Sequence, residues 1–420
     1  MERTVVGIDD TDSATRGMCT TYLAAVIAEH ISSFATVEDR LLVRLNPEVE
    51  HKTRGNAALA LHVETDEPKR VKETVVEAVE ENAVFDDEKT NPGVAFLRGE
   101  PSDALAQYTR EAVREYKTQE EARRIADENG VLVRGWKNGR GVIGATAAVG
   151  ASRAFDDWTY ELLVYRGEEE WGEQRRVSWD TFFDAHNETF PRTWDTVDEE
   201  KGEVVAVPAA PGPVVYGLRG TFGGVWDANA HVEIEEAERL AIYRTNQGTD
   251  AHLVDARACE VEDGGSYRVE GTVAEAPETR EGGHVFFAVE GETGACLRCA
   301  AFEPTGRFRD TVRRLREGDR VVVCGSVSDR TLKVEKMRVV SLVRTERVKP
   351  TCCGRRMESA GRGQGYRCRN PDCDKTAETL VEESVEREIE ERWYEVPPSA
   401  RRHLSMPLVR LRRSPRHETV

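Results

Sequence analysis

Three aspartates close to the N-terminus have the residue type and the spacing to hold a divalent cation. Asp9, Asp10 and Asp12 follow an apolar run at residues 5–8, and a turn rich in hydroxyls and glycine comes after them. An apolar stretch of helical length then runs from residue 22 to residue 31. A strand that ends in an acidic turn before a helix N-terminus places carboxylates beside free backbone N–H groups. The sequence therefore predicts a site for Mg²⁺ and for the phosphates that Mg²⁺ carries.

Four of the nine cysteines are clustered and have the spacing of metal ligands. They form two pairs, Cys352 with Cys353 and Cys368 with Cys373, about fifteen residues apart. This arrangement predicts a zinc ribbon, in which a thiolate site replaces the core that ~30 residues cannot build. The first pair is adjacent and four residues separate the second pair, so four reduced structural cysteines are the alternative interpretation.

Arginines crowd the same cysteine-rich segment and favour RNA as its partner. Tyr366 offers a ring on which an unstacked base can lie, and the arginines can contact phosphates. These arginines are Arg355, Arg356, Arg362, Arg367 and Arg369. A further pair, Cys296 and Cys299, lies in a predicted strand, where we expect both residues to be buried as small apolar side chains.

Length and charge narrow the class of protein. A chain of 420 residues predicts two to four domains, and the absence of a long apolar run or an opening signal peptide predicts a soluble, cytoplasmic protein without membrane contact. The net charge is −18, and only 11 of the 59 basic residues are lysines. Such a composition indicates adaptation to high salt. The alternative is an ordinary acidic cytoplasmic protein.

The charge is distributed unevenly along the chain. From residue 301 onward there are 27 basic and 19 acidic residues, whereas the first 300 residues carry a net −26. A basic third on an acidic protein predicts a polyanionic partner bound by that third.

The element pattern predicts a multidomain α+β protein. Residues 1–155 alternate strands and helices, with strands at 41–45, 57–63, 94–97 and 131–134 and helices at 68–81, 102–116 and 119–129. A glycine-rich turn at 135–145 precedes a helix of small residues, and it suits either a phosphate or tight packing. Residues 156–250 predict a second α+β domain, with a strand at 160–165, a helix at 178–187 and glycine- and proline-rich turns at 208–224.

The remaining segments predict nucleic-acid-binding modules. Residues 251–347 contain five predicted strands with a helix at 308–315 after the third, which is the outline of an OB-fold β-barrel. The strands are expected at 266–274, 284–289, 295–302, 321–326 and 332–343. The zinc ribbon follows at 348–382. Residues 383–420 complete the chain, with a charged helix at about 380–394 and an arginine tail that is either solvated or in contact with RNA.

Several motifs in this order resemble one known family. They are G-I-D-D-T-D-S and R-G-M-C-T-T-Y, then K-T-R-G-N, D-D-E-K-T-N-P-G, N-G-R-G-V-I-G-A, R-T-N-Q-G-T-D and C-G-R-R-M. The chain resembles the archaeal tRNA-Ile agmatinylcytidine synthetases, the TiaS family, over nearly its whole length. The resemblance implies a kinase-like α/β N-terminal domain, a ferredoxin-like domain, an OB-fold and a zinc ribbon. It implies an ATP-dependent ligase that attaches agmatine to C2 of the wobble cytidine of tRNA-Ile with a CAU anticodon.

The resemblance and the chemistry together assign expected roles to individual residues. We expect Asp9, Asp10 and Asp12 to hold Mg²⁺, and Thr20 corresponds to a threonine that becomes phosphorylated in the family. Phosphate clamps are expected at Lys52 and Arg54, with Lys89, Asn91, Gly139, Arg140 and Gly141 binding ATP. Asp86 and Asp87 could bind metal or act as a base. Tyr216 and Gly217 are the expected agmatine-binding residues.

Two other functions fit parts of the pattern. A non-catalytic nucleic-acid-binding protein would need the OB-fold and ribbon but not the triple-aspartate turn. A Mg²⁺ phosphoesterase would use Asp9 and Asp10 and would release phosphate without agmatine. We predict no obligate protein partner.

Overall fold

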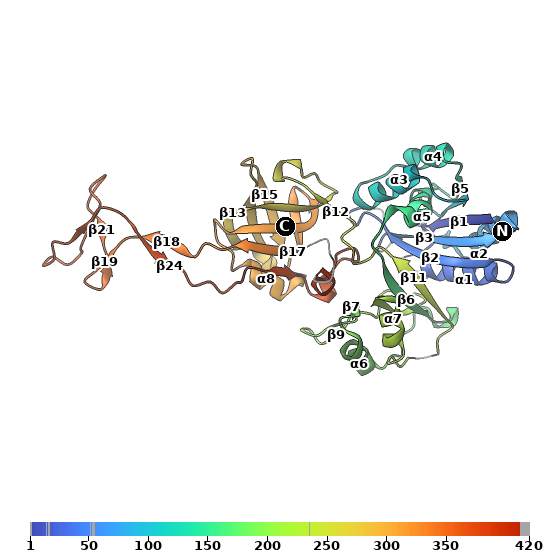
Figure 1. Cartoon of the computed structure of the whole chain (residues 1–420). Helices are drawn as coiled ribbons and strands as arrows, with labels where there is room; N and C mark the ends of the chain where they lie inside the picture. The colour runs from blue at the N-terminus through green and yellow to red at the C-terminus, as the bar shows by residue number, and fades with distance from the viewer. Residues whose placement is uncertain are drawn as a thin grey trace.

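The computed structural model describes residues 2–13, 15, 17–50, 52, 55–234 and 236–411. The described chain is elongated, with the N-terminal sheet at one end, a second sheet in the middle and the cysteine-rich segment at the other end (Figure 1). Within these residues, no helix combines the length and the apolar character needed to cross a membrane.

A nine-stranded mixed sheet organises the N-terminal end, in the order β5-β4-β1-β3-β2-β11-β6-β10-β7. Its strands are β1 (Glu2–Asp9), β2 (Thr36–Arg44), β3 (Ala57–Thr65), β4 (Gly93–Arg98), β5 (Leu132–Gly135), β6 (Thr159–Tyr165), β7 (Thr193–Trp194), β10 (Val214–Gly220) and β11 (Arg239–Thr245). Helices α1 (Thr20–Ser32) and α2 (Pro68–Asn82) pack together on one face. Helices α3 (Asp103–Arg114), α4 (Gln119–Glu128) and α5 (Val142–Ala154) cover the other.

Strand β1 lies between β3 and β4 and is buried on both faces, which explains its continuous apolar run. Val6 and Ile8 contact the core under α1, whereas Val5 contacts the core under α5. Gly7 lets α5 lie directly on the strand, because a Cβ there would be 2.0 Å from the Ala145 carbonyl oxygen. The predicted strands and helices of this part are confirmed, and the core on both sides fixes where β1 ends.

The sheet continues without a break into the second predicted domain. Strand β11 pairs in parallel with β2 and antiparallel with β6, so the two parts share backbone hydrogen bonds. Helices α6 (Trp179–Thr189) and α7 (Phe222–Asn229) enclose a core with β6 and β10. The expected turn over residues 217–224 is wrong: Gly217 and Gly220 lie inside β10, because β6 and β7 hydrogen-bond to that strand, and a helix follows. A small hairpin of β8 (Val197–Asp198) and β9 (Glu203–Val204) lies between β7 and β10 in sequence.

A second sheet follows, and its five main strands each pair with two neighbours, in the order β13-β14-β15-β17-β16 and back to β13. They are β13 (Ser266–Thr279), β14 (Val285–Glu290), β15 (Cys296–Ala301), β16 (Arg320–Ser328) and β17 (Thr331–Ser341). Short strands β12 (Leu253–Asp255) and β25 (Trp393–Glu395) pair with β13 and β17, and helix α8 (Arg307–Val312) follows β15. All five strands and the helix are confirmed. Cys299 is buried as expected, but Cys296 is exposed.

A two-stranded stalk carries the cysteine-rich segment away from the second sheet (Figure 1). The stalk pairs β18 (Thr345–Val348) with β24 (Val381–Ser384), and five two-residue strands lie beyond it. These strands are β19 (Thr351–Cys352), β20 (Arg355–Arg356), β21 (Glu358–Ser359), β22 (Tyr366–Arg367) and β23 (Thr376–Ala377). The expected charged helix at about 380–394 is wrong, because pairing of β24 with β18 and of β25 with β17 holds both ends of that segment extended.

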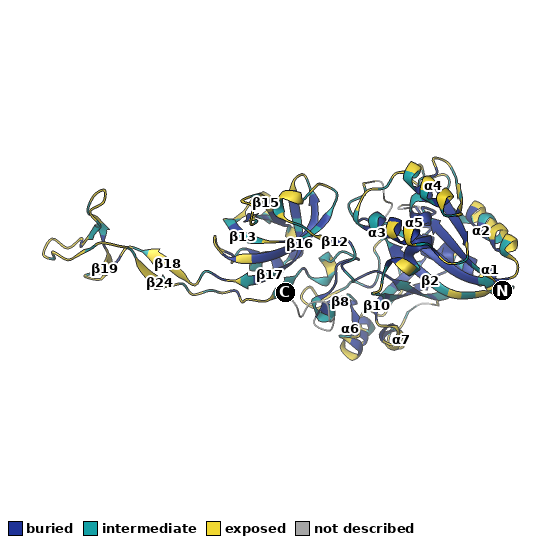
Figure 2. Ribbon diagram, turned by 45° about the horizontal axis from the view of Figure 1, so that its top comes forward, coloured by how far each residue is buried: buried dark blue, intermediate teal, exposed yellow. Residues whose placement is uncertain are grey.

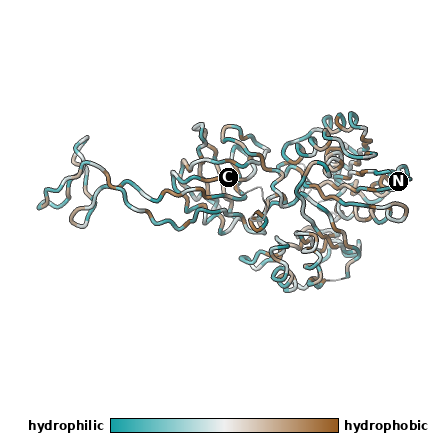
Figure 3. Tube along the Cα trace, in the orientation of Figure 1, coloured by the Kyte–Doolittle hydropathy of each residue, from teal (hydrophilic) through white to brown (hydrophobic). Residues whose placement is uncertain are grey.

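Burial differs sharply between the two ends of the molecule. The strands of the N-terminal sheet are buried over most of their length, whereas the segment beyond the stalk is mostly exposed (Figure 2). Apolar residues are likewise concentrated in the two sheets (Figure 3). After β25 the chain returns to the first sheet and ends its described part in the short helix α9 (Leu408–Leu411).

Candidate active site and zinc centre

A cavity of about 460 Å³ lies where β1 and α1 approach β6 and β10. Its walls come from both parts of the nine-stranded sheet and from the C-terminal segment. The predicted site residues that line it are Asp9, Asp10, Asp12, Thr20, Lys52, Arg140 and Gly217. The structure therefore brings together residues that are up to 208 positions apart in the sequence.

The acidic turn has a backbone shape that turns its carboxylates into the cavity. Asp9 is the last residue of β1, and Asp10 adopts a left-handed conformation with φ of 57°. The Asp10 backbone N–H donates to Asp9 Oδ1 at 2.8 Å. Arg140 donates to Asp10 Oδ2 at 2.8 Å. Thr20 is the first residue of α1, and its hydroxyl accepts a hydrogen bond from the Thr11 hydroxyl at 3.1 Å.

The carboxylates of this turn are unfavourably placed for ionisation. Burial, with the neighbouring Asp10 and Asp12 carboxylates, raises the pKa of Asp9 well above its ordinary value. Burial also raises the pKa of Asp10, to about 7, although Arg140 opposes the shift. Ionisation of these carboxylates is unfavourable in the absence of a ligand. A bound hard divalent cation would offset that cost, and carboxylate oxygens are the ligands it prefers. The residue types therefore suit Mg²⁺, but the three aspartates do not have one oxygen each within 4.8 Å of the other two, so a bound ion would have to draw them together.

The other expected phosphate-binding residues lie in two adjoining turns, before β4 and before α5, which support Arg140 and do not line the cavity. The Lys89 carbonyl accepts a hydrogen bond from Arg140 at 2.8 Å, and the Asn91 carbonyl accepts one from the Gly141 N–H at 2.9 Å. A Cβ on Gly141 would lie 2.4 Å from the Gly93 nitrogen, so close packing accounts for this glycine. Gly139 has a positive φ of 73°.

Asp86 and Asp87 also lie outside the cavity wall. The Ser13 hydroxyl donates to Asp87 Oδ2 at 2.5 Å, which ties this turn to the acidic turn. Lys52 lines the cavity and donates to the Pro47 carbonyl. Arg54 lies outside the described residues.

The two expected agmatine-binding residues point to opposite faces of β10. Gly217 lines the cavity, whereas the Tyr216 ring packs edge-on against Phe182 in the core under α6 and donates to Asn229 Oδ1 at 2.7 Å. Successive side chains of a strand alternate between faces, so only one of two adjacent residues can face the cavity. Tyr216 therefore does not line this cavity, and its expected role in binding agmatine stays a prediction.

A buried charge network also lines the cavity, and the sequence pattern gave no prediction of it. Glu161 on β6 accepts hydrogen bonds from Arg219 at 3.1 Å and from Gln247 at 2.5 Å, with Arg44 at 3.7 Å. Burial raises the pKa of Glu161, but the two arginines outweigh burial and lower it overall. The available signal was a charged residue inside an otherwise apolar strand, as in residues 41–45 and 160–165.

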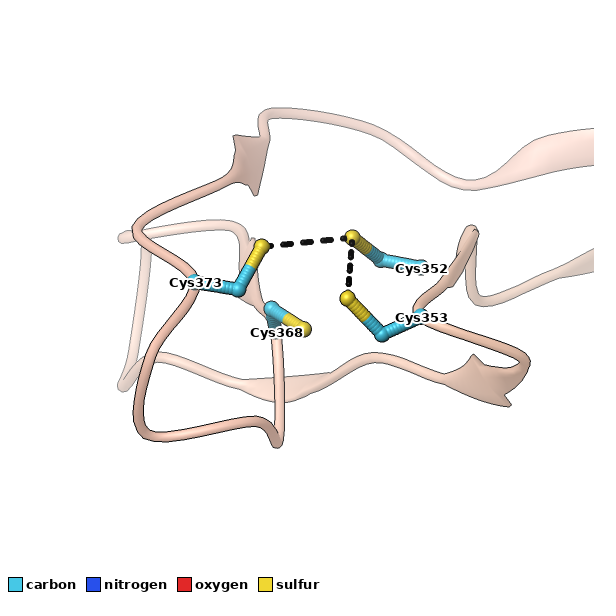
Figure 4. Close-up of side chains that lie close together, drawn as sticks. All are labelled: Cys352, Cys353, Cys368 and Cys373. Atoms are coloured by element: carbon cyan, nitrogen blue, oxygen red, sulfur yellow. Dashed lines mark hydrogen bonds between the residues drawn. The ribbon is translucent and has the colours of Figure 1, made fainter.

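The four expected zinc ligands converge at the far end of the molecule (Figure 4). One sulfur from each of Cys352, Cys353, Cys368 and Cys373 lies within 4.8 Å of all the others. The Cys352 Sγ is 3.9 Å from that of Cys353 and 3.7 Å from that of Cys373. Thiolates at about 2.3 Å from a tetrahedral Zn²⁺ lie about 3.8 Å apart, so the site fits zinc. Left-handed backbone at Cys353, with φ of 48°, lets two adjacent cysteines face one point.

A second cluster of possible metal ligands, Asp250, His252 and Glu335, already contains a cation from the chain. Lys336 Nζ donates to the two Asp250 oxygens at 2.7 and 2.6 Å. His252 Nε2 lies 3.0 Å from Glu335 Oε1. This buried cluster joins the first sheet to the second.

The chain is thus a multidomain α+β protein with two separate sites. One is a cavity lined by three aspartates and several basic residues, and the other is a four-cysteine metal centre. Three family models match the chain: the TiaS TCKD domain over residues 5–137, the TiaS FLD domain over 139–252 and the TiaS C-terminal zinc ribbon domain over 349–389. The chain belongs to the TiaS family.

Full-length relatives and solved structures agree with this assignment. A protein of Methanosarcina mazei is 46% identical over 418 residues and one of Haloquadratum walsbyi is 43% identical over 453 residues, each covering 97% of both chains. Both are named as the 2-agmatinylcytidine synthetase TiaS of an isoleucine tRNA. A crystal structure of TiaS in complex with an isoleucine tRNA and ATP matches with a TM-score of 0.87 at 42% identity, covering 98% of both chains. A complex of TiaS with an isoleucine tRNA, AMPCPP and agmatine matches at 0.86 and 40%, also covering 98% of both.

Proposed function

We infer that this chain is an ATP-dependent ligase that attaches agmatine to a cytidine of an isoleucine tRNA. The observation that carries the inference is the cavity in which Asp9, Asp10, Asp12 and Arg140 meet, in a chain that matches relatives of that name over 97% of its length. The acceptor is C2 of the wobble cytidine in a CAU anticodon, so that the modified tRNA reads AUA.

The chemistry follows from the poor reactivity of the cytosine C2 carbonyl, whose oxygen does not leave unaided. Transfer of a phosphoryl group from ATP to that oxygen creates a phosphate leaving group. The agmatine amine then forms a bond to C2, the C2–O bond breaks with loss of phosphate, and the amine releases a proton. Such transfers depend on positioning and on neutralising phosphate charge. Arg140 and Lys52 supply positive charge at the cavity wall, and Thr20 offers a hydroxyl at the start of α1.

The three aspartates would hold Mg²⁺, which neutralises phosphate charge when bound. Their raised pKa values support this role, because a bound cation removes the cost of keeping adjacent carboxylates ionised. The Glu161 network holds Arg44 and Arg219 in place in the cavity wall, where they can meet the anionic substrates.

The finer architecture is also part of the proposal. The domains are kinase-like (1–155), ferredoxin-like (156–250, with agmatine bound near Gly217), an OB-fold barrel (251–347), the ribbon (348–382) and a C-terminal segment. The mutual pairing of five strands and the surplus of basic residues after residue 301 support an RNA-binding barrel. We place the protein in the cytoplasm of a salt-adapted cell, on the basis of its acidic, lysine-poor composition.

The test is a complete reaction with purified protein, ATP, Mg²⁺, agmatine and the isoleucine tRNA that carries a CAU anticodon. Mass spectrometry of the wobble nucleoside should show the mass of cytidine plus agmatine minus water, only when ATP and agmatine are both present. Tight tRNA binding without ATP turnover would instead indicate a non-catalytic binding protein. Phosphate release that is independent of agmatine and tRNA would indicate a phosphoesterase.

A further inference from the structure

The segment after β25, residues 396–411, crosses from the second sheet to the first and is here called the C-terminal strap. Its Val396 N–H donates to the Glu335 carbonyl at 3.1 Å, and the Ser399 hydroxyl donates to Asp198 at 2.6 Å. Farther along, the Gly248 N–H donates to the His403 carbonyl at 2.8 Å, and Arg410 pairs with Asp157 at 2.9 Å. The strap is thus fixed to both sheets along its length.

Four strap residues reach the catalytic cavity, and two of them carry ionisable side chains. Pro398, Ser399, Arg401 and His403 line the cavity wall. Arg401 is committed to structure, because it pairs with Asp195 and, at 2.9 Å, with Glu395. The His403 imidazole is different: its Nδ1 is buried and has no hydrogen-bond partner among the described residues.

The surroundings of His403 keep the ring neutral and in place. Burial lowers its pKa well below the ordinary value, and the Arg44 and Arg219 guanidiniums add to that shift. The ring lies against Gly55, where an added Cβ would be 3.0 Å from His403 Cδ2 and 2.4 Å from an Arg44 nitrogen. A neutral imidazole with a buried, unpartnered nitrogen at a cavity wall is suited to a ligand atom or a base edge.

A second cavity, of about 490 Å³, meets the first at His403 and at Lys52. It lies between the loop after β2, strand β17 and the strap, with Lys333 supplied by β17. Its charged lining consists of Arg44, Lys52, Lys333 and Arg402 against Glu48 and Glu50. A net positive passage that leads from the second sheet to the acidic turn suits an RNA backbone.

We propose that the C-terminal strap contributes a substrate-binding residue to the catalytic cavity. His403 contacts the target nucleotide of the tRNA, and the RNA strand enters through the second cavity. This proposal rests on the proposed function. An unstacked base can stack on a histidine ring and can satisfy its free nitrogen, whereas neighbouring phosphates meet Lys52 and compete with Glu48 for Lys333, which pairs with that carboxylate at 3.3 Å. The strap thereby makes the second sheet a contributor to the catalytic site.

The test compares His403→Ala, His403→Asn and His403→Phe in the full-length protein, with His30→Ala on the exposed end of α1 as a matched control. Steady-state assays would measure KM separately for tRNA, ATP and agmatine. Loss of one base contact is expected to raise the KM for tRNA about tenfold in His403→Ala. The KM values for ATP and agmatine should change less than about twofold, the scatter expected for a residue that does not touch them.

The two other variants separate the kinds of contact. Recovery in His403→Asn supports a hydrogen bond to the base, and recovery in His403→Phe supports stacking. If all three variants keep the wild-type KM for tRNA, or if all three substrates are affected equally, the proposal is overturned. Wild-type protein that makes no modified nucleoside would instead overturn the proposed function, so the two failures are distinguishable.

Discussion

Two groups of buried carboxylates in this protein have pKa values that are shifted in opposite directions. In the acidic turn, burial and adjacent carboxylates raise the pKa of Asp9, and burial raises that of Asp10 to about 7. At the junction of the two sheets, burial also opposes ionisation of Glu335, but His252, Lys336 and Arg402 outweigh it and lower the pKa to about 2. Both groups are buried, but only Glu335 at the junction has enough positive charge nearby in the chain to lower its pKa.

The opposite pKa shifts indicate that the junction carboxylates have a structural role and that the acidic turn has a ligand-binding role. At the sheet junction, Asp250 pairs with Lys336 and Glu335 lies 3.0 Å from His252, so the cluster holds the sheets together without any ligand. In the acidic turn, Arg140 pairs with Asp10, yet the pKa values of Asp9 and Asp10 stay raised, so a ligand that binds there would supply the remaining positive charge. Removing a charged partner at the junction should therefore lower the stability of the protein. Removing a carboxylate from the acidic turn should raise the stability of the Mg²⁺-free protein.

The largest effect on stability is expected from Lys336→Ala. Lys336 Nζ is the cation paired with Asp250, and both residues are buried. Breaking a buried pair from one side costs about 3–5 kcal/mol, because the remaining charge is uncompensated. Urea unfolding should show this loss in the free energy of unfolding, while Lys201→Ala, on the exposed loop after β8, should be neutral. A loss below about 1 kcal/mol, typical of an exposed pair, would contradict the account.

Loss of zinc should act on RNA binding and leave the first sheet intact. The segment beyond the stalk has few buried side chains, so its structure depends on the thiolate site. Cys373→Ser is expected to abolish zinc binding and to weaken tRNA affinity about tenfold through lost phosphate contacts. Metal analysis and filter binding would measure the two effects, with the exposed Cys259→Ser as control. Unchanged affinity in a zinc-free protein would assign the ribbon no part in binding.

Asp9→Asn should stabilise the Mg²⁺-free protein by about 1–2 kcal/mol, because it removes a charge whose pKa is raised by burial and by like-charged neighbours. The asparagine oxygen can still accept the hydrogen bond from the Asp10 N–H. Mg²⁺ should raise the melting temperature of the wild type but not of this variant. Asp103→Asn, at an exposed helix start, provides the control. An equal Mg²⁺ effect in Asp9→Asn would exclude this carboxylate as a ligand.

The last prediction concerns the dependence of stability on pH. Asp10 has a pKa of about 7 when folded and 3.8 as its reference, so the folded protein binds more protons between these values. Stability without Mg²⁺ should therefore fall as pH rises through that window. Glu335 acts in the opposite direction: its contribution is present above pH 4.5 and is lost as pH falls toward 2. Denaturation curves from pH 3 to 8, with and without Mg²⁺, should show the upper decline only without the ion.

The sequence predicted the elements of both sheets and the closeness of Asp9, Asp10 and Asp12 at the end of the first strand, because local apolar periodicity and a short turn specify them. The role expected for Arg140, which lies 130 residues from Asp10, came from the family resemblance. The sequence could not predict that β2 pairs with β11 across some 200 residues, or that Arg44 and Arg219 meet over Glu161. Those contacts depend on sheet order, which no local pattern encodes.

The C-terminal end shows the same limit most clearly. Residues 380–394 are rich in charge and were expected to form a helix. They contain strands β24 and β25 instead, which pair with β18 and β17. The described arginines of the tail are not simply solvated, since Arg401, Arg402 and Arg410 pair with Asp195, Glu48 and Asp157. Contact of the tail with RNA stays a prediction. The remaining arginines of the tail, Arg412, Arg413 and Arg416, lie outside the described residues.

The central claim is that the acidic turn performs the chemistry while other parts of the chain hold the RNA. The most direct test is the rate at which Asp10→Asn converts the wobble cytidine of the isoleucine tRNA, measured by nucleoside mass spectrometry on protein that is folded and still binds the tRNA. The account predicts a loss of at least about 10²–10³-fold with unchanged tRNA affinity. Conversion at the wild-type rate would contradict it.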